Sequence, residues 1–284
     1  MIRILSDSTC DLSPELIAEH QITIMPLSVI LGEDAYLDGK DITPEEIYAW
    51  SDSHRASPKT AAFSEAQAVD CFKPLLESGD ELICFAISES MSASAQVMRL
   101  AAEELDAEDR VHVIDSQSLS SGVGLLVIEA AIMAREGKPA DEIVAAVEAL
   151  RPKVRASFVV DTLVYLHRGG RCSGLAAMMG GALKLHPRIS VESGKMLPGR
   201  KYRGSMDRVI RQYTVDMRED LLAAKPDRVF ITHSGCPDEQ VAEVKAWLEE
   251  LHHFTDILIT RAGGVVSSHC GPGTLGVLFI DSRA

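Results

Sequence analysis

The sequence predicts an α/β fold of two domains, a parallel α/β/α sheet domain followed by a mixed-sheet α/β domain. Two observations predict it. In the first half, short apolar runs rich in β-branched residues alternate with segments of helical apolar spacing, an order typical of a parallel sheet with helices on its faces. In the second half, strand-like runs on both sides of Ser193-Gly194 predict a hairpin, so the second sheet is expected to be mixed.

The first half opens with an expected strand at Ile2–Ser6, and cap signals mark the helices that follow. Ser13 precedes Pro14, and Thr43 and Ser64 each begin a capping box. The nearly all-apolar run Ser120–Glu136 predicts a buried crossover helix. The other expected elements are strands at Ile22–Leu31 (interrupted at Pro26), Glu81–Ala86 and Val111–Ile114, a helix with apolar positions Met91, Ala95, Met98, Ala102 and Leu105, and a helix at Asp141–Leu150.

The second half is less regular, and a domain boundary is expected near Arg151-Pro152, giving domains 1–155 and 156–284. The glycine-rich stretch Arg168–Gly174 separates an early strand from a helix. The expected strands are Ser157–Val160, Arg188–Glu192, Lys195–Leu197, Arg228–Thr232, Asp256–Thr260 and Gly276–Asp281. The expected helices are Leu175–Leu185, Ser205–Ala224 and Pro237–Leu251.

Composition excludes several function classes. The 28 basic and 42 acidic residues give a net charge of −14, which would repel nucleic acid. Six cysteines form no CxxC pair and the histidines show no ligand spacing with them, so no metal site is expected. The amino terminus lacks a secretory pattern, and the longest apolar stretch is too short to span a bilayer. We therefore expect a cytoplasmic protein.

Hydroxyl side chains follow the strands of the first half. The segments are Asp7-Ser8-Thr9, Ser57-Pro58-Lys59-Thr60, Ser88–Ser94 and Asp115–Ser118. Parallel sheets bind ligands beyond the carboxyl ends of their strands, and hydroxyls at helix amino termini suit a carboxylate or phosphate. The alternative interpretation is that these residues only cap the following helices.

The motif from His269 to Gly276 contains GxGxxG, but its glycines lead into a strand and not a helix, so a dinucleotide site is excluded. We interpret Gly271-Pro272-Gly273 as a tight turn that fixes His269. The sequence contains no phosphate-binding loop and no nucleophile elbow. A serine–histidine–aspartate hydrolase is still possible, since the residues of such a triad can be far apart in sequence.

Three segments together resemble the DegV family of bacterial fatty-acid-binding proteins. Asp7-Ser8-Thr9-Cys10-Asp11-Leu12 resembles the family's DSTxDL, Leu166–Arg171 its LxxGGR, and His269–Gly273 its HxGPG. The resemblance covers essentially the whole chain. It implies one long-chain fatty acid between two α/β domains, with no cofactor. It also implies a carrier without catalytic residues of its own, which presents the acid's carboxyl group to a separate ATP-dependent fatty acid kinase that makes acyl phosphate for phospholipid synthesis.

The resemblance also implies roles for individual residues. Thr60 and Ser92 match the carboxylate-binding threonine and serine, and His269 matches the histidine of the head-group network. Arg171 matches the arginine implicated in engaging the kinase. The chain departs from the family pattern at Ala61-Ala62 and at Ala93, where glycine is usual. Ala93, Ser94 and Gly271 complete the expected head-group region.

Residue types suggest which side chains line the tunnel for the fatty-acid tail and which form a surface for a partner. Met178 and Met179 lie in an apolar run beyond the GGR segment, and methionine adapts to flexible ligands, so we expect them to line the tail. The basic residues Arg168, Arg171, Arg200, Lys201 and Arg203 form either a solvated surface or a docking patch for an acidic partner or for transient contact with anionic lipid.

Two further functions are open at this point. The protein could be a self-sufficient hydrolase or acyl transferase that uses Ser92 or Ser88 as nucleophile and His269 as base, provided that the base touches the nucleophile. Its two-domain scaffold could also bind another amphipathic carboxylate.

Overall fold

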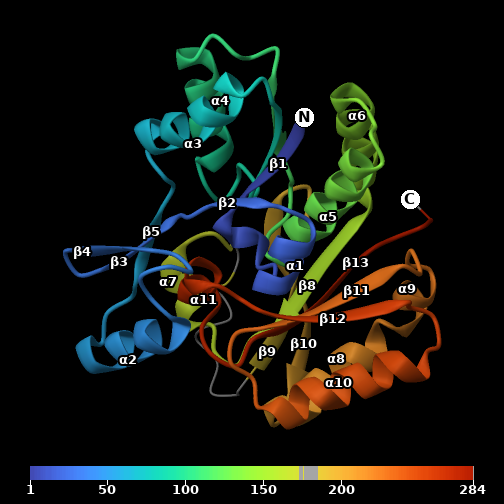
Figure 1. The fold of residues 1–284 in the computed structure, drawn as a ribbon. Coiled ribbons are helices and arrows are strands. Elements are labelled where there is room, and N and C mark those ends of the chain that lie inside the picture. The colour runs from blue at the N-terminus through green and yellow to red at the C-terminus, as the bar shows by residue number, and fades with distance from the viewer. Residues whose placement is uncertain (173–174, 176–184, 284) are drawn as a thin grey trace.

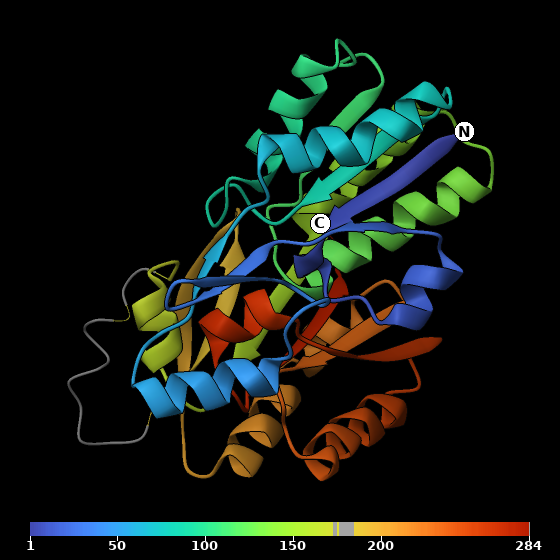
Figure 2. The same ribbon diagram turned by 60° about the vertical axis from the view of Figure 1, so that its left-hand side comes forward.

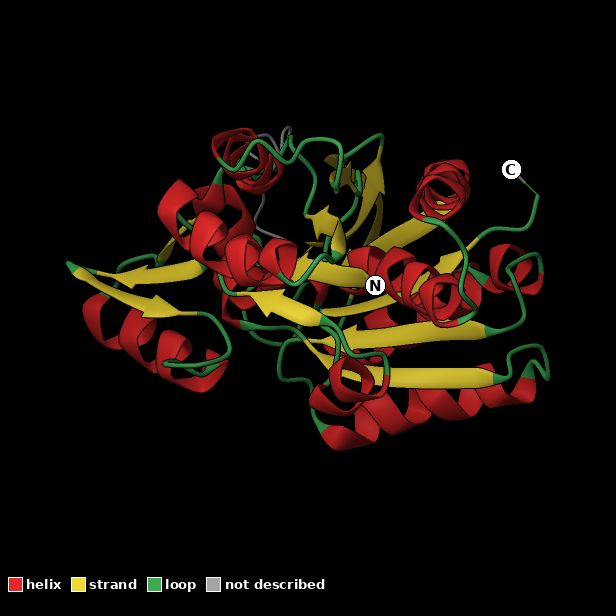
Figure 3. Ribbon diagram, turned by 45° about the horizontal axis from the view of Figure 1, so that its top comes forward, coloured by secondary structure: helices red, strands yellow, loops and turns green. Residues whose placement is uncertain are grey.

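The computed structural model describes residues 1–172, 175 and 185–283, and it consists of alternating layers of helices and sheets (Figures 1 and 3). Helices α3 (Glu65–Glu77) and α4 (Ser94–Glu104) cover one face of a parallel sheet. Helices α5 (Ser121–Arg135) and α6 (Ala140–Leu150) cover its other face. A second sheet follows, and its far face packs on α8 (Met206–Asp216) and α10 (Asp238–Glu250).

The first sheet has four parallel strands in the order β2-β1-β6-β7. They are β1 (Ile2–Asp7), β2 (Thr23–Met25), β6 (Glu81–Ala86) and β7 (Val111–Asp115). Their ends agree with the predicted ends to within two residues, except that β2 ends at Met25. The predicted caps are confirmed: Ser13 caps α1 (Pro14–Glu19), and both capping boxes form, at α2 (Pro44–His54) and at α3.

The second sheet has six strands in the order β10-β9-β8-β13-β11-β12, and only β11 and β12 pair in parallel. They are β8 (Val154–Val159), β9 (Leu185–Glu192), β10 (Lys195–Arg203), β11 (Arg228–His233), β12 (Asp256–Arg261) and β13 (Leu275–Ile280). The predicted β9–β10 hairpin is confirmed, with positive φ at both Ser193 and Gly194 as a two-residue turn of the primed type requires. The sheet is therefore mixed, as expected.

Helix α5 lies between the two sheets (Figure 1). It packs on β1 and β6 of the first sheet and on β8 and β13 of the second. This position explains its composition, because a helix covered on opposite sides by two sheets has no face left for polar residues. The two halves of the chain thus share the hydrophobic cluster around α5. The domain boundary predicted between residues 155 and 156 falls within β8. The division of the chain into two domains stays a prediction.

Several expectations about elements are wrong. The chain breaks at Pro26, and β3 (Ser28–Leu31) leaves the first sheet to form a small antiparallel sheet with two unpredicted strands, β4 (Asp34–Leu37) and β5 (Lys59–Ala61). The predicted helix 205–224 is divided at Met217 into α8 and α9 (Arg218–Leu222). Helix α11 (Gly264–Cys270) was not predicted, and β9 begins at Leu185, where a helix was expected to end. The rest of that expected helix, 176–184, lies outside the described residues.

The small sheet, α2 and α11 lie side by side at the carboxyl ends of the first sheet's strands (Figure 2). The remaining elements are α7 (Val164–Gly169) and the short 3-10 turns at Ser8–Cys10 and Arg151–Lys153. Among the residues described, no helix combines the length and the apolar character that a bilayer crossing needs.

Candidate functional site

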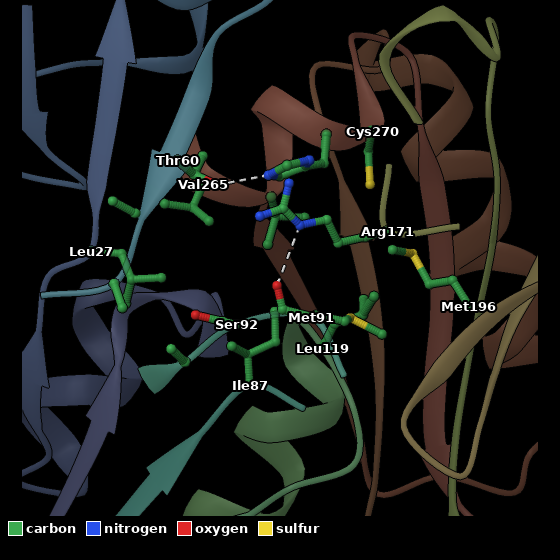
Figure 4. A pocket seen from close by; sticks show the side chains of 15 residues that line it. Leu27, Thr60, Ile87, Met91, Ser92, Leu119, Arg171, Met196, Val265 and Cys270 are labelled. Atoms are coloured by element: carbon green, nitrogen blue, oxygen red, sulfur yellow. Dashed lines mark hydrogen bonds between the residues drawn. The ribbon is translucent and has the colours of Figure 1, made fainter. Parts of the chain in front are cut away.

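A cavity of about 230 Å³ opens where the small sheet, the loop after β6 and helix α11 meet (Figure 4). Its polar side chains are Thr60, Ser92, Arg171 and His269. Apolar side chains make most of the remaining wall, among them Leu27, Ile87, Met91, Leu119, Met196 and Val266. A mostly apolar cavity with a few convergent polar groups is the usual form of a small-molecule site.

Thr60 and His269 are in direct contact within this cavity. Thr60 lies on β5 and His269 near the end of α11, 209 residues further along the chain. The Thr60 Oγ1 and His269 Nε2 atoms are 2.8 Å apart, which is hydrogen-bond distance (Figure 4). Two residues implied by separate motifs therefore act as one polar unit.

The protonation of His269 decides which way this hydrogen bond runs. Burial, with a further contribution from the Arg171 charge, lowers the pKa of His269 to about 4, so the ring is neutral at pH 7. Its Nδ1 atom is buried and has no partner among the described residues, and a Cβ on Gly169 would lie only 2.4 Å from it. Buried N–H groups without partners are rarer than acceptors without partners. We therefore assign the proton to Nε2, which donates to Thr60 and leaves the Thr60 hydroxyl proton for a ligand.

Ser92 borders the same cavity from the loop between β6 and α4. Its Oγ lies 2.9 Å from the Ser94 Oγ, while the Ser94 amide donates to it over a longer 3.4 Å. Two of the contacts that hold this loop come from distant segments: the Ile87 amide donates to the buried Asp7 carboxyl group at 2.9 Å, and the Ser88 hydroxyl donates to the Gly194 carbonyl at 2.8 Å. The second contact joins the loop to the β9–β10 hairpin.

Arg171 contributes a positive charge at the edge of the cavity. Its Nε donates to the Met91 carbonyl at 3.4 Å (Figure 4), and its Nη1 donates to the Gly169 carbonyl at 2.8 Å. The resemblance implies a partner-facing role for this arginine. The structure places it against the cavity as well, close enough to His269 to contribute to its lowered pKa.

The other predicted site residues have different positions. Ala93 lines the cavity, and Ser94 is buried behind Ser92. Gly271 does not line it; its φ of 75° ends α11, and a Cβ there would lie 2.5 Å from the Tyr165 ring. Met178 and Met179 lie outside the described residues.

Most of the apolar wall was not predicted. Met91 directly precedes Ser92, and Cys270 directly follows His269, so proximity to the motif residues is the signal that could have found them. Leu27 and Met196 carry no such signal, because nothing local in the sequence brings them to Ser92. Within residues 1–172, 175 and 185–283, no group of three or more histidine, cysteine, aspartate or glutamate side chains could hold a metal ion.

A family model described as "Uncharacterised protein, DegV family" matches residues 1–282. The chain belongs to the DegV family. A DegV domain-containing protein of Deinococcus radiodurans is 33% identical over 276 residues, which cover 97% of each chain. A DegV family protein from Thermus thermophilus, described as fatty acid binding, has a similar solved structure with a TM-score of 0.91, 30% identity and 99% coverage of both chains. A stearic acid-binding protein from Eubacterium ventriosum matches with a TM-score of 0.85, 29% identity and 99% coverage of both chains.

Proposed function

We propose that this DegV protein binds one long-chain fatty acid in the cavity, with the carboxylate at Thr60 and Ser92 and the tail along the apolar wall. The observation that carries the proposal is the Thr60–His269 pair, which borders the same cavity as Ser92. The similar structures from Thermus thermophilus and Eubacterium ventriosum, described as binding fatty acid and stearic acid, support this ligand class.

The polar groups suit an anionic head group. A carboxylate that loses water without gaining hydrogen bonds is strongly penalised, so it needs donors at the point where it is buried. The Thr60 hydroxyl, oriented by His269 Nε2–H, is one donor, and the Ser92 hydroxyl is the second. Because His269 is neutral at pH 7, the compensating charge comes from Arg171 at the cavity edge.

The apolar wall indicates that the fatty-acid tail runs from the head-group site toward the second sheet. A smaller cavity of about 20 Å³ shares Leu119, Val266 and Cys270 with the main one and reaches Phe158 and Leu278 of the second sheet. Burying about fourteen methylenes at about 0.8 kcal/mol each supplies on the order of 11 kcal/mol. Association costs about 4–15 kcal/mol, so the tail alone barely retains the ligand and the head-group donors decide the affinity.

We further propose that the protein acts in the cytoplasm as a carrier and presents the carboxyl group to a separate ATP-dependent fatty acid kinase. Two exposed basic residues support a docking surface for an acidic partner: Arg171, which borders the cavity, and Arg168 three residues before it. Arg171→Glu is expected to lower acyl-phosphate formation by an added kinase more than it lowers fatty-acid occupancy. Intact acyl-phosphate formation in this variant would exclude the docking role.

The alternative of a self-sufficient hydrolase or acyl transferase has less support. A general base must reach its nucleophile. The hydrogen-bond partner of His269 Nε2 is Thr60, while Ser88 donates to the Gly194 carbonyl and Ser92 pairs with Ser94. Neither proposed serine is thus paired with the histidine.

Mass spectrometry of the lipid extracted from purified protein tests the binding proposal. We expect one long-chain fatty acid per chain, and Ser92→Ala is expected to reduce the retained amount about tenfold, since one hydrogen bond to a charged group is lost. Ser90→Ala is the matched control, because Ser90 lies in the same loop but does not line the cavity. Recovery of no fatty acid, or turnover of ester substrates, would count against a carrier.

A further inference from the structure

The segment Asp7–Leu12, singled out in the sequence, does not line the cavity in the described structure. Its two aspartates are nevertheless buried, as is Asp38, which directly follows β4. A buried carboxyl group is costly unless hydrogen bonds compensate it. The partners of these side chains therefore indicate what each of them does.

Asp11 and Asp38 accept hydrogen bonds from backbone amides at the amino terminus of α11. The Gly263 amide donates to Asp11 Oδ1 at 2.8 Å, and the Gly264 amide donates to Asp38 Oδ1 at 2.6 Å. The second oxygen of each carboxyl group is held from the other side. The Ser120 hydroxyl donates to Asp11 Oδ2, and the Ser8 hydroxyl donates to Asp38 Oδ2 at 2.8 Å.

Helix α11 depends on these two partners. It has only seven residues, and its sequence Gly-Val-Val-Ser-Ser-His-Cys contains poor helix formers. Carboxyl oxygens at a helix amino terminus accept hydrogen bonds from its free amides, whether or not the group is ionised. The glycines leave room for them: a Cβ at Gly263 would lie 3.2 Å from Asp38 Oδ1 and 3.3 Å from Asp11 Oδ1, closer than most such contacts.

The same helix carries His269 in its last turn and places Val265, Val266 and Cys270 in the cavity wall. Asp11 and Asp38 come from the first part of the chain, as does Thr60. A displacement of the helix relative to that part would separate His269 Nε2 from Thr60 Oγ1, which now lie at 2.8 Å. We propose that Asp11 and Asp38 are positioning residues that fix α11, so that His269 orients the Thr60 hydroxyl toward the head group; the inference rests on the proposed fatty-acid function.

Paired substitutions test this role. Asp11→Ala and Asp38→Ala remove the acceptors, and we expect about tenfold weaker fatty-acid binding, since one head-group donor loses its orientation. Asp11→Asn and Asp38→Asn keep an oxygen for the glycine amide, and their NH₂ group can donate to Ser120 or Ser8, so affinity is expected to stay close to that of the unchanged protein. Asp80→Ala is the control, because Asp80 is equally buried but pairs with Met1 and Arg3.

The second readout is independent of the ligand. The ¹⁵N chemical shifts of the His269 ring, identified by their loss in His269→Gln, report the hydrogen bond to Thr60 in the ligand-free protein. We expect them to change in the alanine variants and to return in the asparagine variants. Unchanged ring shifts and affinity in folded alanine variants would overturn the proposal. A protein that binds no fatty acid would refute the proposed function, while the ring shifts would still test the positioning.

If the alanine variants do not fold, a third kind of variant, Gly263→Ala, tests the same proposal. Gly263→Ala keeps both carboxylates and suits the backbone, which is extended at this position, but its methyl group must push them away. We expect changed His269 ring shifts and weaker binding in this variant. Ring shifts and affinity equal to those of the unchanged protein would overturn the proposal.

Discussion

Gly169 contacts the imidazole of His269 so closely that no side chain fits between them. It is the last residue of α7, and a Cβ there would lie 2.4 Å from His269 Nδ1. The neighbouring Gly170 has a positive φ of 69° and open space around it. The two glycines of the GGR segment therefore serve different purposes: Gly169 provides close approach to the ring, and Gly170 ends the helix.

Gly169→Ala is expected to weaken fatty-acid binding about tenfold, because the ring must move away from Thr60 and one oriented donor is lost. Elsewhere in a helix the same change stabilises by about 1 kcal/mol, so helix propensity alone would stabilise the folded protein and would not weaken binding. Fluorescent fatty-acid displacement measures the affinity. Gly170→Asn is the matched control, since asparagine accepts a positive φ and meets no neighbour. Equal affinities of both variants would contradict this account of Gly169.

The motifs suggested Thr60, Ser92 and His269 through the resemblance, and all three border one cavity in the structure. Their roles as ligand donors stay predictions. The contact between Thr60 and His269 could not be predicted, because 209 residues separate them and only the packing of α11 on the small sheet brings them together. The position of Arg171 against the cavity has the same origin, since it depends on how α7 packs on α11.

Among the elements, α5 is the one whose environment the sequence predicts best. Its residues from Ser121 to Ile128 are all buried, and its two sides face different sheets. A helix without a polar face is stable where other elements cover it on all sides. Helix α11 is the opposite case: valines, serines and glycines give no helical signal, and contacts from distant segments stabilise the helix.

Leu125→Ala in α5 is expected to lower the free energy of unfolding by about 2–5 kcal/mol, because it leaves a cavity in the core shared by the two sheets. Urea denaturation followed by circular dichroism measures the change. Leu100→Ala in α4 removes the same atoms from a side chain that is 39% exposed, and it should cost less than about 1 kcal/mol. A similar loss in both variants would show that α5 is not the central layer.

The small sheet explains why short elements escaped prediction. Strands β4 and β5 have only four and three residues and alternate few apolar side chains, so they resemble loops in sequence. Pairing with β3 forms them, and this pairing is visible only in three dimensions. Because Thr60 belongs to β5, the least predictable element carries a central residue of the candidate site.

At the scale of the whole molecule, buried carboxyl groups determine how stability responds to pH. Burial raises the pKa of Asp11 to about 8 and that of Asp7 to about 6, from 3.8 in each case. A folded protein that holds protons which the unfolded chain releases becomes less stable as pH rises. His269 has the opposite sign, because its pKa falls from 6.5 to about 4, but only about 0.4 kcal/mol of this effect remains above pH 6.5.

Between pH 6.5 and pH 8 the Asp11 contribution is therefore expected to dominate. The free energy of unfolding should fall by about 1–2 kcal/mol over this interval, since one pKa unit corresponds to about 1.4 kcal/mol. Urea titrations at both pH values measure the change. In Asp11→Asn, which cannot titrate, the decline should be smaller by that amount. An equal decline in the variant would show that Asp11 does not hold a proton in the folded protein.

The place of β13 in the second sheet has a consequence for synthesis of the protein. This strand follows all the other described strands in sequence order, yet it lies in the interior of the sheet, between β8 and β11. Until residues 275–280 leave the ribosome, both neighbouring strands have an unpaired edge, and α5 lacks part of the surface that covers it. The second half can therefore close only after residues 275–280 have been inserted between β8 and β11, and until then both edges are open to pairing with other chains.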